Sequence, residues 1–311
     1  MKLLISGGTG FIGSALCRTL AQRGHELIIL SRQPARQTPF ARATFLPWDA
    51  NVWPRAAEGC DGVVNLAGES IAAKRWSLTQ KDLIRDSRLQ ATRQLVDAIA
   101  GWPKKPAVVV NASAVGYYGP RGDEQLTEAD GAGTGFLADV CRAWEAQAQR
   151  AEPLGVRVVR LRMGLVLGSG GGALSKMVPP FQWCVGGPLG TGRQWVSWIH
   201  QDDVVGLIDW ALKTPLIRGA VNATAPEPVT MREFCRCLGD VLHRPSWAPV
   251  PSVVLRALLG EMSDLLLTGQ RVIPHVALQQ NYAFVHPALL SALHACFAPH
   301  RVETPAVATA T

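Results

Sequence analysis

The amino-acid sequence predicts an α/β fold in which a doubly wound parallel sheet is followed by a smaller, mainly helical C-terminal lobe. Three observations lead to this prediction. Apolar runs alternate with helix-like segments over the first 165 residues, joined by short links. The runs are nearly continuous in apolar character, as expected for parallel strands buried on both faces. After residue 164, glycine-rich loops and helical segments separated by prolines replace this alternation.

Six strands are expected in the first part of the chain. They are LLIS (3–6), ELIIL (26–30), ATFLP (43–47), GVVNLA (62–67), AVVVNAS (107–113) and VRVVRL (156–161). Between the first two, Ile12, Leu16 and Leu20 recur at helical spacing, and Gly24 is placed to end that helix. Longer helices are expected over about 79–100 and 136–150, which completes the strand-helix alternation.

Composition divides the chain into three parts. Residues 1–165 are expected to form the sheet domain and residues 166–300 the C-terminal lobe. The tail over 301–311 ends in ETPAVATAT, which carries no pattern and is expected to be disordered. Within the lobe, helices are expected over 231–242, 252–267 and 287–296.

The charge balance is basic, with 31 Lys and Arg against 24 Asp and Glu. Because no basic run exceeds two residues, we expect a solvated surface with a cationic pocket rather than a nucleic-acid partner. No apolar run is long enough to cross a bilayer. The first residues, MKLLIS, run into glycines too early to form the apolar segment of a signal peptide. The seven cysteines include no Cys-x-x-Cys pair, so reduced thiols are expected. We therefore expect a soluble cytoplasmic protein with no membrane partner.

A glycine motif, ISGGTGFIGSAL (5–16), follows the first expected strand and opens the first expected helix. In this context Gly7 permits a tight turn, Gly10 lets the backbone approach a pyrophosphate, and Gly13 lets the helix pack on the strand. The amino end of the helix then faces the phosphates. The alternative is a glycine-rich turn without a ligand. The context favours a dinucleotide site and a Rossmann-type domain.

The end of the second expected strand indicates which dinucleotide is bound. NAD-binding proteins place a carboxylate there to bond the ribose hydroxyls, whereas this chain has Ser31 and Arg32. Ser31 can donate a hydrogen bond, and Arg32 can pair with a 2′-phosphate and stack on adenine. The alternative is that Arg32 is only a surface charge. We predict NADP(H) as the cofactor.

Motifs along nearly the whole chain carry a family resemblance. They include SGGTGFIG, NLAGESI, SAVGYYG, RMGLVLGSGGGAL, SWIHQDD, VNATAP and GQRVIP, between residues 6 and 274. Together they resemble the extended short-chain dehydrogenase/reductase superfamily, and more narrowly its atypical epimerase-like subgroup, which has a C-terminal domain of unknown function. The resemblance implies that residues 1–165 are an NADP-binding Rossmann domain and that 166–300 form a substrate-binding lobe.

The resemblance also implies a set of cofactor contacts. Transferred to this sequence, they are Gly7, Gly10, Phe11, Ile12, Gly13, Ser31, Arg32, Leu66, Ala67 and Arg88, with Met163 beside the nicotinamide.

The usual catalytic pair of this superfamily, Tyr-x-x-x-Lys, is absent from the sequence. The three tyrosines are followed four residues later by Arg121, Gly122 and His286, and no lysine occurs between residues 105 and 176. Alignment on Trp144-Glu145 puts Leu137 and Cys141 in the places of the pair. A hydride can still move, because the cofactor carries that chemistry, but another group must supply the proton.

Ser113, Tyr117 and Tyr118 are the candidate catalytic residues, because they follow the fifth expected strand, where a ligand would sit. Each has a structural alternative. The tyrosines can pack in the loop with their hydroxyls in water, and Ser113 can cap the turn. Cys141 is expected to be a buried apolar thiol.

No metal site is predicted. One histidine, His200, stands close to Asp202 and Asp203, but metal binding needs convergent ligands. We expect one of the two acids to cap a helix that starts near Val204, and His200 to contact substrate. The glycine run 168–172 lacks the Gly-Lys-Ser/Thr ending of a P-loop and is expected to be a mobile loop.

Two hypotheses for the function follow. The first is an NADP(H)-dependent, epimerase-like oxidoreductase that acts on a small carbonyl, hydroxyl or sugar-derived substrate. The second is a non-catalytic regulatory or interaction protein that senses NADP(H), which the missing Tyr-Lys pair favours. The retained GYYG and SWIHQDD segments favour the enzyme. A homodimer is expected by analogy with extended relatives only.

Overall fold

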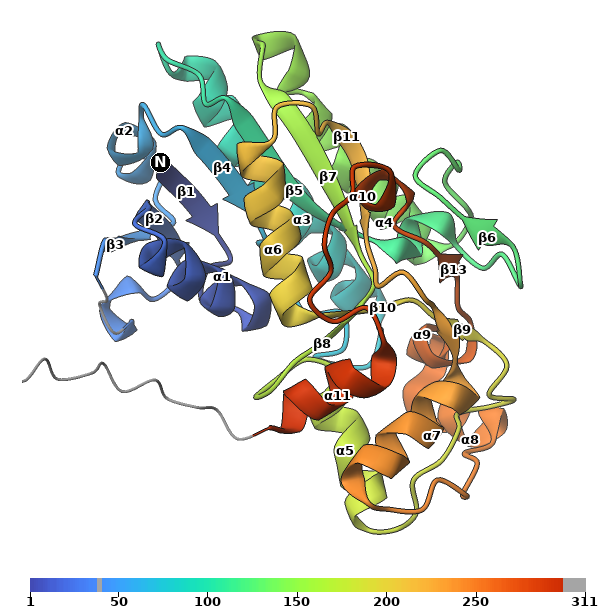
Figure 1. Ribbon diagram of the computed structural model, residues 1–311. Helices are drawn as coiled ribbons and strands as arrows, with labels where there is room; N and C mark the ends of the chain where they lie inside the picture. Colours follow the sequence, from blue (N-terminus) through green and yellow to red (C-terminus); the bar gives the residue numbers. More distant parts are fainter. Residues whose placement is uncertain (38–40, 299–311) are drawn as a thin grey trace, which may run out of the picture.

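Within residues 1–37 and 41–298, which the computed structural model describes, seven parallel strands form the central sheet (Figure 1). The strands are β1 (Lys2–Ser6), β2 (Glu26–Ser31), β3 (Ala43–Pro47), β4 (Gly62–Asn65), β5 (Val108–Ala114), β7 (Arg157–Met163) and β11 (Gly219–Ala223). Their order is β11-β7-β5-β4-β1-β2-β3. The strand order reverses beside β1, and ligands of such sheets bind at the carboxyl ends of strands at this point.

Helices cover both faces of the sheet, which confirms the predicted fold class. They are α1 (Phe11–Gln22), α2 (Trp53–Ala57), α3 (Leu78–Gly101), α4 (Phe136–Gln149), α5 (Leu174–Gln182), α6 (Gln201–Lys213), α7 (Met231–Leu242), α8 (Ser252–Leu259), α9 (Asp264–Leu267), α10 (His275–Gln279) and α11 (Leu289–Phe297). In Figure 1, α1 and α6 lie in front of the sheet, and α3 and α4 lie behind it.

Alternation along the strands divides the core into two layers. Leu3 and Ile5 of β1 pack with Leu16 of α1 and with α6, whereas Leu4 faces Leu95 and the rest of the α3–α4 layer. Because successive strand side chains point to opposite faces, a strand buried on both sides needs the continuous apolar run seen in the sequence.

A separate hydrophobic core holds the C-terminal lobe together. Trp198, Phe234, Leu238 and Leu293 are buried in it, on β10 (Trp198–His200), α7 and α11. The pair of β6 (Gln125–Leu126) with β13 (Arg271–Val272) joins the lobe to the first part of the chain. Two further short pairs lie within the lobe or at its start: β8 (Leu165–Leu167) with β10, and β9 (Trp195–Val196) with β12 (Val229–Thr230).

The structure differs from the sequence-based boundaries in two places. Strand β11 and helix α6 belong to the sheet layers, so these layers extend beyond residue 165. The continuous helix predicted over 252–267 is wrong, because Gly260 has a φ of +60° and ends α8. The tail predicted over 301–311 lies outside the described residues.

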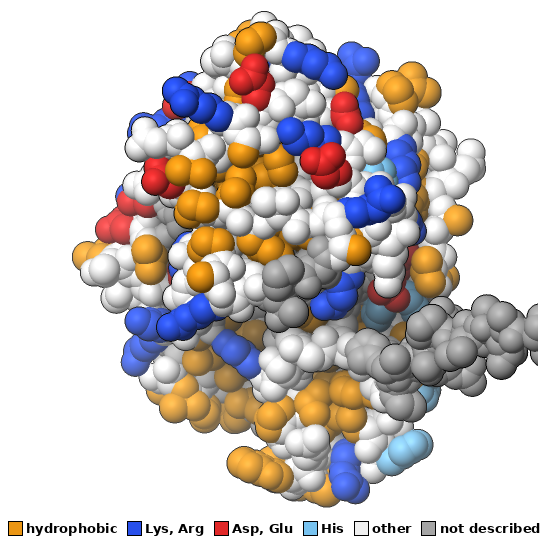
Figure 2. Space-filling view, turned by 90° about the vertical axis from the view of Figure 1, so that its left-hand side faces the viewer, with side chains coloured by type: hydrophobic (Ala, Val, Ile, Leu, Met, Phe, Trp, Pro, Cys, Tyr) orange, Lys and Arg blue, Asp and Glu red, His pale blue; other side chains and the backbone are white. Residues whose placement is uncertain are grey.

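Charges of both signs are mixed on the surface. On the face in Figure 2, Lys and Arg lie interspersed with Asp and Glu over the upper part, and hydrophobic side chains gather in the lower part. The basic residues of this face therefore do not merge into one patch. Among the described residues, no helix has the length and apolar character needed to span a bilayer.

The layered core predicts unequal effects of two leucine substitutions. Leu16 is fully buried between α1 and the sheet, whereas Leu78 begins α3 with 82% of its surface exposed. Leu16→Ala should lower the free energy of unfolding by about 2–5 kcal/mol, because it leaves a cavity in the core. Leu78→Ala should change it by less than about 0.5 kcal/mol. Urea denaturation measures both values, and equal losses would contradict the assignment of this core.

Candidate cofactor and substrate site

The glycine loop between β1 and α1 is built from backbone contacts that leave no room for side chains. A Cβ on Gly13 would lie 2.1 Å from the carbonyl oxygen of Gly7, and a Cβ on Gly7 would lie 2.6 Å from the backbone of Leu66. Gly7 also has a φ of +71°, a conformation that favours glycine. Gly10 occupies the N-cap of α1, where no side chain caps the helix. The first amides of α1 are therefore available to an anionic ligand.

The turn after β4 completes one wall of this loop. Leu66 and Ala67 are the residues whose backbones approach Gly7. The amide of Ala67 donates to Asn65 Oδ1 at 3.3 Å, which holds the turn against the end of the strand. The structure thus brings together predicted cofactor contacts that are about 60 residues apart in the chain.

Arg88 reaches the same turn from α3. Its guanidinium donates to the carbonyl oxygens of Glu69 and Ile84, both at 2.9 Å, and lies over the ring of Trp144. Burial lowers the pKa of Arg88, and no described carboxylate lies within salt-bridge distance of it. A half-buried cation that has no carboxylate partner among the described residues is suited to a ligand that brings its own negative charge.

The end of β2 presents two different side chains. Ser31 is buried, and its Oγ accepts a hydrogen bond from the amide of Gln33 at 3.1 Å. Arg32 is exposed and forms no salt bridge with any described residue. Its guanidinium is therefore free to pair with a phosphate at the edge of the sheet.

Phe11 links the glycine loop to the C-terminal part of the chain. Its carbonyl oxygen accepts from Gln201 Nε2 at 2.7 Å, and its ring packs against the backbone at Gly171 and Gly172. The glycine run predicted to be a mobile loop thus contacts a predicted cofactor residue. Ile12, also half-buried, follows on α1, and Met163 ends β7 directly beside Ala114 of β5.

A buried polar network lies under the carboxyl ends of β5, β7 and β11. The register places Ser113, Arg162 and Asn222 side by side on these three strands. Glu145 of α4 packs onto this row. It accepts from Ser113 Oγ at 2.7 Å and from Arg162 Nε and Nη2 at 2.8 and 3.0 Å. Burial lowers the pKa of Arg162, but the hydrogen bonds and charge of Glu145 outweigh burial and raise it.

The two candidate tyrosines have different surroundings. Tyr118 is fully buried, and its hydroxyl donates to Asn222 Oδ1 at 2.7 Å and accepts from Arg162 Nη1 at 2.9 Å. Burial raises the pKa of Tyr118 to about 12. Tyr117 is half-buried, and its ring lies 3.5 Å from the guanidinium carbon of Arg162. Within the described residues the Tyr117 hydroxyl has no hydrogen-bond partner, so it is the phenol that remains free for a ligand.

Helix α4 carries apolar and thiol side chains where the resemblance expects the Tyr-Lys pair. Leu137 packs near Gly116, and Cys141 is buried beside Ser113. Burial raises the pKa of the Cys141 thiol to about 11, with the charge of Glu145 adding to the rise. The thiol is therefore neutral near pH 7 and cannot supply the positive charge of a lysine.

Sequence reasoning did not single out Arg162, Glu145 or Asn222 as functional residues. A signal was nevertheless present, since Arg157 and Arg160 interrupt the expected strand VRVVRL, and Arg162 follows directly after it. A charged residue in such a strand requires a buried partner. The distance of Glu145 and Asn222 along the chain concealed that partner.

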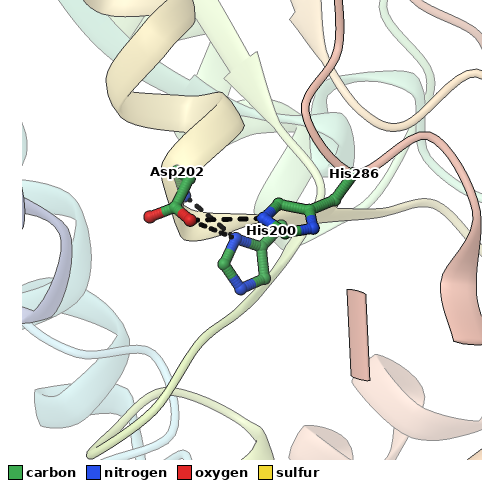
Figure 3. A group of neighbouring side chains, drawn as sticks. All are labelled: His200, Asp202 and His286. Carbon is green, nitrogen blue, oxygen red and sulfur yellow. Dashed lines mark hydrogen bonds and ion pairs between the residues drawn. The ribbon is translucent and has the colours of Figure 1, made fainter. Parts of the chain in front are cut away.

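A second polar cluster, His200–Asp202–His286, lies at the start of α6 (Figure 3). His200, rather than Asp202 or Asp203, is the N-cap, and its Nδ1 accepts from the amide of Asp202. The predicted capping by an aspartate is wrong because α6 begins at Gln201, which puts both acids in its first turn. Asp203 instead accepts from the amides of Val285 and His286. The contact with His200 lowers the pKa of Asp202.

Comparison with known proteins places this geometry in a family. Residues 3–222 match the model of the NAD dependent epimerase/dehydratase family, and residues 250–296 match a domain of unknown function, DUF1731. A chloroplastic homolog of epimerase family protein SDR39U1 from Arabidopsis thaliana is 42% identical over 301 residues, covering 95% of this chain and 86% of the relative.

Two solved structures extend the comparison. Human epimerase family protein SDR39U1, solved with NADPH, has a TM-score of 0.86 and 35% identity, covering 95% of this chain and 99% of the relative. A nucleoside-diphosphate sugar epimerase from Corynebacterium glutamicum has a TM-score of 0.76 and 31% identity, covering 96% of this chain and 58% of that one. The predicted resemblance is confirmed, and the chain belongs to the NAD dependent epimerase/dehydratase family, with a DUF1731 domain at its C-terminal end.

Proposed function

We propose that this protein binds NADP(H) at the glycine loop and acts as an oxidoreductase or epimerase on a small carbonyl, hydroxyl or sugar-derived substrate. The observation that carries the proposal is the loop itself, where Gly7 and Gly13 exclude side chains and the amino end of α1 has no side-chain cap. Such an arrangement suits a pyrophosphate. The human relative solved with NADPH, 35% identical over nearly the whole chain, supports the same cofactor.

The residues after β2 support NADP(H) over NAD(H). A carboxylate at this position would repel a 2′-phosphate, and the chain has Ser31 and Arg32 instead, with no salt bridge from Arg32 to any residue that the structure describes. Guanidinium groups bind phosphates through paired, charge-assisted hydrogen bonds. Arg88 would supply a second positive charge near the turn that follows β4.

Bound NADPH would supply the hydride, and the protein must orient the substrate and provide a proton. We assign the proton to Tyr117, whose hydroxyl is free of protein partners while its ring rests on Arg162. The cation–π contact with Arg162 orients the Tyr117 ring at the carboxyl ends of the strands, where ligands of such sheets bind. Glu145 holds Arg162 in place through hydrogen bonds. Ser113 is buried and donates its hydroxyl hydrogen bond to the same carboxylate.

One observation favours the second candidate function, an NADP(H) sensor without turnover. Ser113 and Tyr118 already have their hydroxyl groups bonded inside the protein, which leaves Tyr117 as the single free hydroxyl among the three candidates within the described part of the chain. A sensor would bind NADPH equally well and would oxidise none of it in the presence of substrates.

Substitution of Arg32 tests the cofactor assignment. Arg32→Ala should weaken NADPH binding by about 10- to 100-fold, since it removes a charged hydrogen-bond partner, and should leave NADH binding nearly unchanged. The matched control is Arg55→Ala on α2, an exposed arginine next to Ala56, whose carbonyl oxygen accepts from Lys2 at the amino end of β1. Titration calorimetry gives the affinities of the wild-type protein and both variants for the two dinucleotides. Equal losses for the two dinucleotides would refute the phosphate assignment.

Substitution of the two tyrosines tests the chemistry. On a panel of aldehydes, ketones and nucleotide sugars, Tyr117→Phe should lower kcat by about 100-fold or more while NADPH affinity is kept. Tyr118→Phe should instead lower the free energy of unfolding by about 1–3 kcal/mol, because Asn222 and Arg162 lose their partner. NADPH absorbance follows turnover, and product analysis detects epimerisation. NADPH binding without turnover by wild-type protein on the whole panel would support the sensor.

A further inference from the structure

The His200–Asp202–His286 cluster brings two imidazoles to one carboxylate oxygen. His200 ends β10, Asp202 lies in the first turn of α6, and His286 comes from the segment between α10 and α11 (Figure 3). Asp202 Oδ2 lies 3.3 Å from His200 Nδ1 and 3.2 Å from His286 Nε2. All three ligand atoms lie within 4.8 Å of one another.

The hydrogen bonds of His200 leave one contact in the cluster unexplained. Its Nδ1 lies 3.2 Å from the amide of Asp202, which can only donate, so Nδ1 carries a lone pair there rather than a proton. The same lone pair also lies close to the carboxylate oxygen of Asp202. Two acceptors in contact repel each other unless a cation lies between them. A proton or a metal ion on Nδ1 would remove this repulsion, and either one would take the lone pair from the amide of Asp202.

We propose that His200, Asp202 and His286 form a site for a divalent transition-metal ion, with Zn²⁺ as the best-suited ion. Zinc is bound by histidine nitrogen and aspartate oxygen at about 2.0–2.2 Å, and tetrahedral bonds of that length put neighbouring ligand atoms about 3.3 Å apart. Two of the three distances in the cluster match this spacing. Water would fill the fourth position, since 62% of the Asp202 side chain is exposed.

The position of the cluster gives such an ion a structural consequence. The helix dipole makes the amino end of α6 unfavourable for a cation. The negative charges of Asp202 and Asp203, both in the first turn, offset this effect. Gln201, between two of the ligands in the sequence, donates to the carbonyl oxygen of Phe11 in the glycine loop. A bound ion would therefore tie the segment around His286 to a helix that contacts the predicted cofactor loop. The proposal does not depend on the proposed function.

Zinc titration of untagged protein, freed of metal by chelator, tests the site. Calorimetry should give one Zn²⁺ per chain, and Asp202→Asn and His286→Ala should each weaken its binding by about 100-fold or more. Two controls should bind like wild type. His294→Ala removes an exposed histidine of α11, and Cys184→Ser removes the exposed cysteine. Circular dichroism checks the fold of each variant, and His286→Gln replaces His286→Ala if the latter does not fold.

Cobalt provides a readout that is independent of the variants. Co²⁺ bound to wild-type protein should give the intense visible bands of a tetrahedral ion without a thiolate charge-transfer band. Absence of one-to-one Zn²⁺ binding by wild-type protein would overturn the proposal. The three side chains would then be held together by hydrogen bonds alone. Zinc binding that survives in both folded ligand variants, or a thiolate band with Co²⁺, would overturn it as well.

Discussion

The close approach of Gly13 to the carbonyl oxygen of Gly7 is the constraint on which the candidate site depends. It lets α1 start directly at the end of β1, with a glycine rather than a capping side chain in front of its first amides. The same packing presses Gly7 against the turn after β4, so the loop, that turn and Arg88 meet at the point where the strand order reverses. A single methyl group at Gly7 or Gly13 would separate these parts.

Buried polar side chains lie near the carboxyl ends of the sheet strands. The Arg162–Glu145 pair, nearly free of solvent, joins Ser113, Tyr118 and Asn222 across three strands. A neighbouring network runs from Ser6 through Asn65 to Asn111. Buried ion pairs add little net stability compared with apolar packing, so their value here lies in fixed geometry. The Arg162–Glu145 pair sets the position of the guanidinium on which the Tyr117 ring rests.

The sheet, its main helices and the glycine loop could be predicted from the sequence because the patterns that indicate them lie within short stretches of the chain. Continuous apolar runs and glycine spacing depend on near neighbours in the chain, as at Leu3–Ser6 and Gly7–Gly13. Sequence reasoning missed what tertiary contacts decide. His286 joins His200 from 86 positions away, Glu145 finds Arg162 on another element, and Gly260 breaks a helix whose apolar pattern continues past it. The structure also shows that Tyr118 is fully buried whereas Tyr117 is only half-buried. The sequence could not distinguish the two tyrosines, because they are adjacent.

The central claim is that bare backbone amides at the start of α1 hold the diphosphate of a phosphorylated nicotinamide dinucleotide. Titration calorimetry of the wild-type protein with NADPH and with NADH tests it most directly. The account predicts one site per chain and tighter binding of NADPH than of NADH. Absence of binding heat for both dinucleotides over a range of temperatures, or tighter binding of NADH, would contradict it.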